Sequence, residues 1–350
     1  MAWPIVLLTP NLTGHDGISA VARLVVRAFD RVSVLALHER RSLTAFEGST
    51  VDSAGGHSLR FATAAVCAAA RGSRTTLIVN HVHLAPAALA FAARGATLVS
   101  LLHGIEAWTP LTWLQRAALL RSDRLIAVSA CSRDRFRAAN PQFGNRAIDV
   151  CHHGIEPASV PDAASDDIPT ALIVGRMTAD ERYKGHDALI EIWPDVLAAV
   201  PDAVLRVVGG GDDRPRLERK AVAMGLGVHV VFAGSIDDET LQREYQRATV
   251  FTMPSPREGF GLVFLEAMRA ARPCIGCRGA PSEIIDDGTT GWIVEPGDRA
   301  QLTARVIRAL RDRSESAAMG ARGRTRYLQY FTEERFRQRL TALMPEATPV

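Results

Sequence analysis

Most of this sequence alternates short aliphatic runs with segments long enough for amphipathic helices. In the first half the runs PIVLL, TTLIVN, ATLVSLL and RLIAVS are each followed by a helical pattern, at 19–29, 86–93, 111–120 and 132–139. Parallel strands need a crossover connection, which is usually a helix, so this rhythm indicates repeated βαβ units. The sequence therefore predicts an α/β fold with parallel sheets that are covered by helices on both faces.

One stretch interrupts the rhythm. PASVPDAASDDIPT, at 157–170, has the Pro, Ser and Asp content of a linker, and further strand and helix patterns follow it. A length of 350 residues suits two domains of ordinary size. We predict Rossmann-like domains at 1–160 and 161–330. A C-terminal segment, 331–350, carries a helix that crosses back to brace the first domain. Such sheets are expected to face across a cleft at the carboxyl ends of their strands.

The composition excludes several classes of protein. A chain with 47% hydrophobic and 23% charged residues is globular rather than disordered or membrane-spanning. The apolar stretch near the start is far shorter than the roughly 20 residues of a membrane helix and lacks a basic leader, so we expect a cytoplasmic protein. Residues 1–165 hold 16 arginines and 11 acidic residues. These arginines are scattered, so no nucleic acid is expected as a partner, while attraction to an anionic membrane surface stays open.

No metal site is expected. Five cysteines, an odd number without an export signal, predict reduced thiols. The pair in CIGC, at 274–277, has no second CxxC or histidine pair at zinc-finger spacing. Asp212, Asp237 and Asp286 are not part of a sugar-flanked DxD motif and are interpreted as helix caps or turns.

The stretch SPREGFGLVFLEAM, at 255–268, suggests an anion site beside sugar hydroxyls. A strand is expected to end near its first residue and a helix to begin near Gly261, where unpaired amides and the helix dipole favour a phosphate. The amides concerned are those of Gly259, Phe260, Gly261 and Leu262. Carboxylates would repel a phosphate unless they bind neighbouring hydroxyls, so we assign Glu266 to a ribose diol and Glu258 to a sugar beyond the phosphate. Taken alone, both glutamates fit solvated surface positions equally well.

A second motif, VGRMTADERYKGHDALI, supplies cations for the same ligand. Arg176 follows a predicted strand, and Lys184 precedes a predicted helix. The chain contains two lysines, Lys184 and Lys220, against 39 arginines, so a lysine in this loop indicates a need for a compact ammonium charge. A leaving diphosphate creates that need, with Arg176 as a bidentate partner. Lys220 lies in a helical pattern with other basic residues and is expected on a solvated face.

Together these residues resemble the retaining glycosyltransferases of the GT-B fold, family four. The likeness covers nearly the whole chain and is more specific in the second half. It rests on Gly175-Arg176, Lys184-Gly185, the glycine turn 209–211, the Glu-x7-Glu pair of Glu258 and Glu266, and GAPSE at 279–283. The resemblance implies that Arg176 and Lys184 bind the donor diphosphate, that Glu266 binds the ribose, and that Glu258 contacts the donor sugar.

The same resemblance implies four further site residues. The backbone around Ser235 and Ile236, in FAGSID, would meet the nucleobase. In the first domain, TPNLTGHDGISAVAR is similar to the family's glycine-rich loop near the donor phosphates, in which Gly17 opens a helix that begins at Ser19. His103, in LLHGIEAW, follows a strand end where the family often has a histidine that touches the transferred sugar.

The expected activity is transfer of a hexosyl unit from a GDP- or UDP-sugar to an acceptor hydroxyl. In this reaction the domain at 161–330 is expected to bind the nucleotide-sugar donor, and the domain at 1–160 to lie on the acceptor side. Retention at the anomeric carbon is implied by the resemblance alone, as is a glycan or lipid-linked acceptor in bacterial exopolysaccharide or lipopolysaccharide synthesis. Arg176, Lys184 and a helix N-terminus can stabilise the charge on the leaving diphosphate, so we expect neither a metal nor a cofactor.

Three alternatives remain. A nucleotide-sugar epimerase of similar fold would need carboxylates placed to abstract a sugar proton. A non-catalytic nucleotide-sugar-binding subunit would need the same binding residues. A nicotinamide enzyme fits less well, because VVGGGDD lacks a third glycine and an acidic residue about 20 positions further on that suits a ribose.

Overall fold

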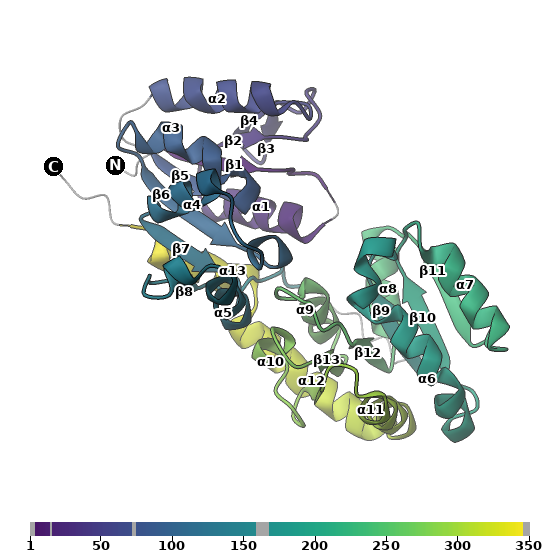
Figure 1. Ribbon diagram of the computed structural model, residues 1–350. Helices are drawn as coiled ribbons and strands as arrows, with labels where there is room; N and C mark the ends of the chain where they lie inside the picture. Colours follow the sequence, from purple (N-terminus) through teal and green to yellow (C-terminus); the bar gives the residue numbers. More distant parts are fainter. Residues whose placement is uncertain (1–3, 15, 72–74, 159–167, 346–350) are drawn as a thin grey trace. The chain divides into compact units, whose positions relative to one another are not determined.

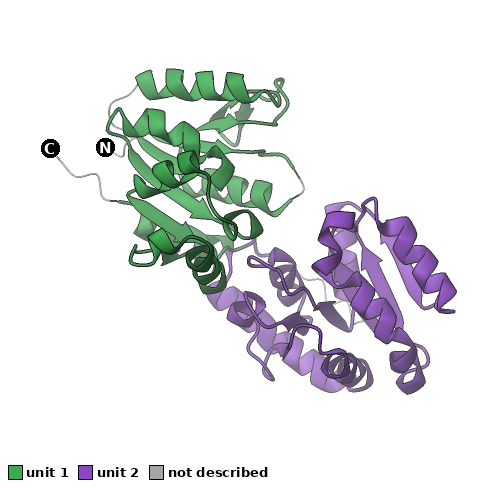
Figure 2. Ribbon diagram, in the orientation of Figure 1, with its two compact units in different colours: residues 1–154, 333–350 green, residues 155–332 purple. Residues whose placement is uncertain are grey.

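The computed structural model describes residues 4–14, 16–71, 75–158 and 168–345 (Figure 1). The chain divides into two compact units, which Figure 2 shows in green and purple. Unit 1 comprises Met1–Gly154 and Glu333–Val350, and unit 2 comprises Ile155–Thr332. The chain therefore passes between the units twice, and its last helix, α13 (Glu333–Leu343), belongs to unit 1. Most of the predicted linker at 157–170 lies outside the described residues.

Unit 1 is built on one sheet with the strand order β3-β4-β2-β1-β5-β6-β7-β8. Its strands are β1 (Ile5–Thr9), β2 (Val32–Ala36), β3 (Ala45–Phe46), β4 (Ser49–Ser53), β5 (Thr76–Val79), β6 (Thr97–Leu102), β7 (Arg124–Ala127) and β8 (Asp149–Val150). The pairs are parallel except for β3 with β4. The order reverses between β1 and β5, which makes the carboxyl ends of these two strands a switch point where ligands bind in such folds.

Helices cover both faces of this sheet. Because side chains alternate along a strand, Leu7 of β1 packs with α1 (Gly17–Ala28) and α13, whereas Val6 and Leu8 pack on the opposite face. The helices on that face are α2 (Ser58–Arg71), α3 (Ala88–Ala92), α4 (Trp113–Leu120) and α5 (Ala130–Ala139). The helix expected at 86–93 is split into a 3-10 turn, Val82–Ala87, and α3. Pro86 lies in the turn, and an α-helical interior does not tolerate proline well.

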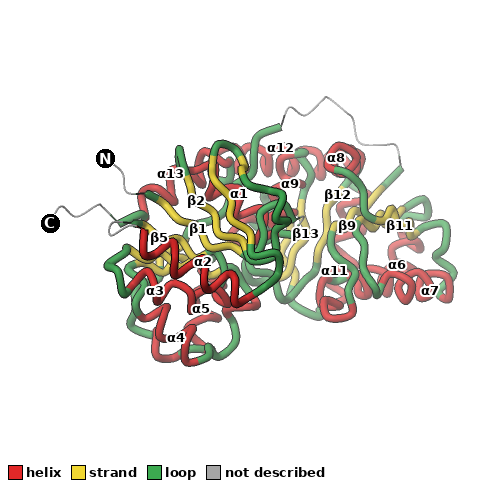
Figure 3. The backbone as a smooth tube through the Cα atoms, turned by 90° about the horizontal axis from the view of Figure 1, so that it is seen from above, coloured by secondary structure: helices red, strands yellow, loops and turns green. Residues whose placement is uncertain are grey.

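Unit 2 holds a parallel sheet with the order β11-β10-β9-β12-β13-β14. Its strands are β9 (Thr170–Val174), β10 (Val204–Val208), β11 (Val230–Gly234), β12 (Val250–Met253), β13 (Cys274–Cys277) and β14 (Gly291–Val294). In Figure 3 these strands appear in yellow between red helices. The order matches the Rossmann pattern 3-2-1-4-5-6, with its switch point between β9 and β12. The predicted α/β class with parallel sheets is confirmed.

The helices of unit 2 also lie on two faces of the sheet. One face packs against α6 (His186–Ala199), α7 (Arg214–Ala223) and α11 (Arg299–Arg311). The other packs against α8 (Asp238–Arg247) and α9 (Leu262–Arg269), where Phe251 of β12 meets Phe264 of α9 with ring centroids 5.3 Å apart. Two further helices, α10 (Pro281–Ile284) and α12 (Arg313–Tyr330), contact α9.

Candidate functional site

The loops at the switch point of unit 2 meet at a glycine. Lys184 ends a 3-10 segment, Ala179–Lys184, that follows β9, and Gly185 has a φ of +97°. A Cβ atom at Gly185 would lie 2.7 Å from Cγ of Pro254, in the loop after β12. Glycine is therefore required here for its backbone conformation and for close packing. That packing holds Lys184 beside the β12 loop, which carries Glu258.

Lys184 and Glu258 form an ion pair. Nζ of Lys184 donates to Oε2 of Glu258 at 3.0 Å, and the two side chains are only 18% and 14% exposed. The sequence predicted separate partners for them, a diphosphate and a sugar, and did not predict this contact. A diphosphate that binds Lys184 would compete with the carboxylate for the same ammonium hydrogens.

Arg176 also has a carboxylate partner, Glu181, which the sequence analysis missed. Nη2 of Arg176 donates to Oε1 of Glu181 at 2.7 Å, and the arginine side chain is 65% exposed. The hydroxyl of Tyr183 donates to the same oxygen at 3.3 Å. Burial and the charge of Glu181 raise the pKa of Tyr183 to about 12, so its hydroxyl stays protonated. The guanidinium of Arg176 is open to an anion from solvent.

Arg257 adds a third cation that the sequence analysis overlooked, although it directly precedes Glu258. Its guanidinium carbon lies 5.1 Å from the ring centroid of Tyr183, and Nζ of Lys184 lies 5.7 Å from the same centroid. Both distances suit cation–π contacts. Lys184 and Arg257 thus lie beside one tyrosine ring, and Arg176 is linked to its hydroxyl through Glu181, which makes this edge of the sheet suited to a polyanion.

Helix α9 begins beside these cations. Gly261 caps it with a φ of +98°, and a Cβ atom there would lie 2.6 Å from Phe264 and 3.3 Å from Cγ of Glu258. The amides of Leu262 and Val263 have no acceptor within the helix and lie at the positive end of its dipole, whereas the amide of Phe264 donates to the carbonyl of Gly261 at 3.0 Å. Gly259 and Phe260 belong to the preceding loop, and the Phe260 side chain is buried. The helix start predicted at this point is confirmed.

Glu266 has a different environment from Glu258. Its Oε2 accepts a hydrogen bond from the hydroxyl of Tyr245, on α8, at 2.7 Å. Burial raises the pKa of the Glu266 carboxyl, although the Tyr245 hydrogen bond acts in the opposite direction. The carboxyl lines a small pocket with Gln242 and Gln246. Carboxylate and amide groups of this kind can bind a vicinal diol.

Ser235 and Ile236 connect β11 to α8. Ser235 is exposed and Ile236 is half-buried. A Cβ atom at Gly210 would lie 2.6 Å from Oγ of Ser235, so the glycine turn lies directly against this connection.

The glycine turn 209–211 has a packing explanation. Cβ atoms at Gly209 and Gly211 would lie 2.0 Å from the carbonyl oxygens of Gly175 and Met177 respectively. Both glycines also have positive φ angles, +133° and +151°. The loop after β10 therefore needs glycine to approach the backbone that carries Arg176, and a dinucleotide is not needed to explain these residues.

In unit 1, His103 is almost completely buried, at 7% exposure. Its Nε2 lies 2.8 Å from the carbonyl oxygen and 3.0 Å from Oδ1 of Asn80. A carbonyl oxygen only accepts, so Nε2 carries the hydrogen, and burial lowers the pKa of His103 and favours the neutral ring. Glu106 accepts from the amides of His103 and Gly104, at 3.0 and 2.9 Å. Asn80 and Glu106 were not predicted from the sequence, because hydrogen bonds across strand ends leave no local pattern.

The loop after β1 differs from its prediction in two respects. Helix α1 begins at Gly17 rather than Ser19, because Asp16 caps it by accepting from the amide of Ser19 at 2.9 Å. A Cβ atom at Gly17 would meet no atom within 4 Å, whereas one at Gly14 would lie 2.6 Å from Oγ of Ser19. A side chain at position 14 would therefore have to displace neighbouring polar side chains, whereas position 17 leaves space. The buried carboxylate of Glu39 accepts from two amides of this loop, at 2.8 and 2.9 Å.

Among residues 4–14, 16–71, 75–158 and 168–345, no three His, Cys, Asp or Glu side chains are grouped to hold a metal ion.

Asp237 caps α8, as predicted, by accepting a hydrogen bond from the amide of Thr240. Cys274 and Cys277 are buried on β13, and burial raises the pKa of both thiols, to about 11 for Cys277.

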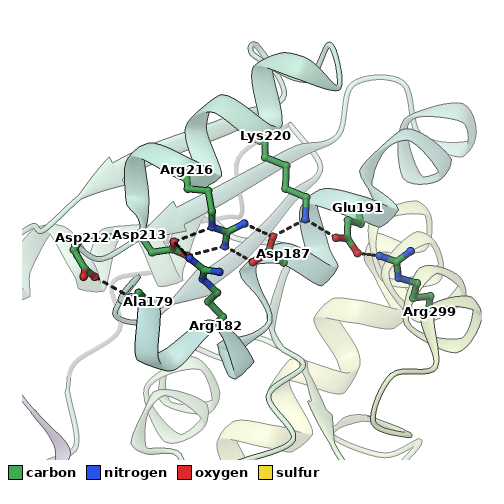
Figure 4. Close-up of polar contacts among 9 residues, drawn as sticks. All are labelled: Ala179, Arg182, Asp187, Glu191, Asp212, Asp213, Arg216, Lys220 and Arg299. Carbon is green, nitrogen blue, oxygen red and sulfur yellow. Dashed lines mark hydrogen bonds and ion pairs between the residues drawn. The ribbon is translucent and has the colours of Figure 1, made fainter.

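Lys220 is not on a solvated face, so that prediction was wrong. It belongs to a connected group of ion pairs on α6 and α7 (Figure 4). Its ammonium contacts Asp187 at 2.5 Å and also contacts Glu191. Helical periodicity located Lys220 on α7, but the opposing acidic residues come from a different helix.

Comparisons with known proteins indicate a family for this chain. Residues 168–312 match the model of the family described as glycosyl transferases group 1. A GDP-mannose-dependent alpha-(1-6)-phosphatidylinositol monomannoside mannosyltransferase of Mycolicibacterium smegmatis is 34% identical over 261 residues, which are 67% of this chain and 66% of the relative. Its namesake in Mycobacterium tuberculosis is 30% identical over 63% of this chain and 62% of the relative. The match thus spans slightly less than two thirds of these relatives' length.

Solved structures agree over nearly the whole chain. Anabaena HepE, in complex with UDP and glucose, has a TM-score of 0.80 at 18% identity and covers 97% of this chain and 98% of its own. Sucrose-phosphate synthase from Thermosynechococcus elongatus has a TM-score of 0.77 at 20% identity, with 98% of both chains covered. These likenesses show a GT-B fold. With this fold and a family model matched in unit 2, the chain belongs to the family of glycosyl transferases group 1.

Proposed function

We propose that this protein is a retaining glycosyltransferase that moves a hexosyl unit from a GDP- or UDP-sugar to the hydroxyl of a glycan or lipid-linked acceptor. The observation that carries the proposal is the group of Arg176, Lys184 and Arg257 beside the N-terminus of α9, at the switch point of unit 2. A diphosphate can accept hydrogen bonds from these cations, in competition with Glu181 and Glu258, and from the first amides of α9. The relatives' names support the donor class, since they mention GDP-mannose and UDP.

In the proposed reaction, the bond between the anomeric carbon and the β-phosphate oxygen breaks, and its electron pair goes to the diphosphate. Arg176, Lys184 and the first amides of α9 stabilise that charge, which is larger in the transition state than in the bound donor. The acceptor oxygen forms the new bond to the anomeric carbon, and its proton goes to the leaving phosphate. Retention is proposed from the resemblance of the donor motifs.

The other predicted residues keep binding roles in this proposal. Glu258 contacts the hexose, Glu266 contacts the ribose, and the backbone at Ser235 and Ile236 meets the base. Unit 1 serves as the acceptor-side unit. Gly17, where a Cβ atom would meet open space, and His103 are assigned donor contacts. Nε2 of His103 donates a hydrogen bond to the carbonyl oxygen of Asn80. We therefore propose that this histidine helps to position the donor and does not transfer a proton.

The function is tested with UDP-, GDP- and ADP-sugars. At a free concentration of about 100 times its Kd, the correct nucleotide adds about 2.7 kcal/mol to the free energy of unfolding, which a thermal-shift screen detects. Incubation of that donor with candidate acceptors is expected to release nucleoside diphosphate together with a glycoside of unchanged anomeric configuration, observed by NMR. Conversion of the donor sugar into its epimer, or release of diphosphate without a glycoside, would contradict the proposal.

Transfer is expected to survive EDTA, because Arg176 and Lys184 supply the positive charge that Mg²⁺ provides in other phosphate sites. The measurement compares initial rates in EDTA, in added Mg²⁺ and in added Mn²⁺. Loss of activity in EDTA that either cation restores would contradict a metal-independent reaction.

We further propose that the protein works on the cytoplasmic side of a membrane, in bacterial cell-surface polysaccharide synthesis. None of the helices in the described part of the chain is long and apolar enough to cross a membrane. However, α2 has two apolar side chains in contact with solvent, Leu59, which is 81% exposed, and Val66, which is 57% exposed. Arg60 and Arg71 of the same helix are also exposed. The sequence has no acidic residue between positions 52 and 106. An apolar and basic face of this kind suits an anionic lipid surface.

Exchanging Leu59 and Val66 for Glu is expected to weaken binding to vesicles that contain phosphatidylglycerol at least tenfold. Each apolar side chain contributes about 1.5–3 kcal/mol when it is buried, and the new charges are repelled. Vesicle sedimentation measures the bound fraction. Val222→Glu is the matched control, because Val222 is 70% exposed on α7 of unit 2. Equal binding by all variants would refute α2 as the contact surface.

A further inference from the structure

A chain of ion pairs borders the Lys184 loop (Figure 4). Asp213 accepts from Arg182 at 3.0 Å and from Arg216 at 2.6 and 2.8 Å. Arg216 also donates to both carboxylate oxygens of Asp187, at 2.9 and 2.5 Å. Lys220, Glu191 and Arg299 extend the chain away from the loop, through contacts of Lys220 with Asp187 and Glu191 and of Arg299 with Glu191.

Two of the residues in these ion pairs lie on either side of Lys184 in the sequence. Arg182 precedes Lys184 by two residues and Asp187 follows it by three, and each is tied to the start of α7, by Asp213 and Arg216 respectively. The Asp213 side chain is only 5% exposed, and the Arg216 hydrogen bonds lower the pKa of Asp187 to about 2. These pairs are therefore charged at neutral pH and partly shielded from water.

The segment needs such a restraint because Gly185 lies within it. Glycine has more backbone freedom than any other residue, and Gly185 adopts a φ of +97° directly after Lys184. A bidentate arginine bridge fixes orientation as well as distance, which a single lysine contact cannot do. The five side-chain hydrogen bonds that join Arg182, Asp213, Arg216 and Asp187 do not involve the Lys184 ammonium, so the bridge can hold the backbone while that ammonium reaches the ligand.

We propose that Arg216 is a positioning residue for Lys184: by joining Asp213 to Asp187 it holds residues 182–187 so that the ammonium stands at the diphosphate site. This inference rests on the proposed function, because it assigns Arg216 to the geometry of the leaving-group contact. It gives the ion pairs of Figure 4 a role in turnover beyond stability.

A double-mutant cycle tests the proposal by kinetics. Arg216→Gln is expected to lower kcat about tenfold when Lys184 is present and less than twofold in a Lys184→Ala background, because coupled residues are not additive. Arg216→Lys, which keeps the charge but not the bidentate bridge, is expected to restore kcat only in part. Arg299→Gln is the matched control at the far end of the chain, with kcat unchanged. Equal losses in both backgrounds would show that Arg216 serves stability alone and would overturn the proposal.

A second readout does not require activity. The chain has two lysines, so acylation of Lys184 by an amine-reactive ester can be followed by mass spectrometry. Arg216→Gln is expected to raise its acylation rate several-fold, because a loosened segment exposes the ammonium, while Arg299→Gln leaves the rate unchanged. An unchanged rate in Arg216→Gln would overturn the positioning role even if the wild type transferred no sugar. Absence of transfer together with a raised rate would refute the proposed function alone.

Discussion

Replacing Lys184 with Ala is expected to lower kcat for sugar transfer about 10²–10³-fold, the usual effect of removing one donor from a preorganised charge-stabilising site. Affinity for the donor should fall much less, because the diphosphate carries more charge as it leaves than when it is bound. The structure adds that Glu258, the partner of Lys184 at 3.0 Å, would lose its cation in this variant. Steady-state kinetics separate the two effects, and a change confined to KM would contradict the leaving-group role.

Lys184→Arg is expected to restore little of this activity. A guanidinium is planar and larger than an ammonium, and Lys184 is 18% exposed between Glu258 and the ring of Tyr183. Thermal unfolding of each variant serves as the control for folding. Full rescue by arginine would mean that charge at this position is sufficient and that compact shape is not required.

The two glutamates of the α9 motif are expected to affect different parts of donor recognition. Glu266→Ala should weaken binding of UDP or GDP by about 1.5–3 kcal/mol, the contribution of a hydrogen bond to a charged group. Glu258→Ala should reduce the transfer rate without weakening that binding, because its proposed partner, the hexose, is absent from the diphosphate. Removing Glu258 would also free Lys184 from its ion pair, which should favour binding of the nucleotide's diphosphate. Calorimetry with the sugar-free nucleotide and transfer assays with the donor measure the two effects.

A surface glutamate gives the matched control for this pair. Glu239 lies on α8 with its side chain 82% exposed, so Glu239→Ala should change neither binding nor transfer. Equal weakening of nucleotide binding in the Glu258 and Glu266 variants, or none in either, would refute the division between hexose and ribose. A general loss of stability cannot produce opposite effects on binding, so the pattern distinguishes recognition from unfolding.

Local patterns predicted most of the strands that lie in the middle of each sheet. β1, β5, β6, β9 and β12 are continuous apolar runs because both of their faces are buried, and such runs are visible in a sequence. In the unit 1 sheet, β2, β4 and the edge strand β3 were not predicted. β4, with the sequence STVDS, alternates between buried and exposed residues and has a single large apolar residue, Val51, so it resembles a loop. Glycines at 185 and 261 were assigned to loops and helix starts correctly, since their positive φ angles are local properties.

Contacts across the sheet required the tertiary structure. The sequence by itself determined which residue types stand at the strand ends, including Arg176, Lys184 and Glu258, and hence the expectation of a diphosphate beside a sugar. Only the strand order, which sets β12 next to β9, decided that Lys184 and Glu258 pair across 74 positions. The contacts of Arg257 with Tyr183 and of Tyr245 with Glu266 also join separate elements, whereas Glu181 lies in the same loop as Arg176. A salt bridge or ring contact depends on distances of a few ångströms between loops, and no periodicity in the sequence encodes such distances.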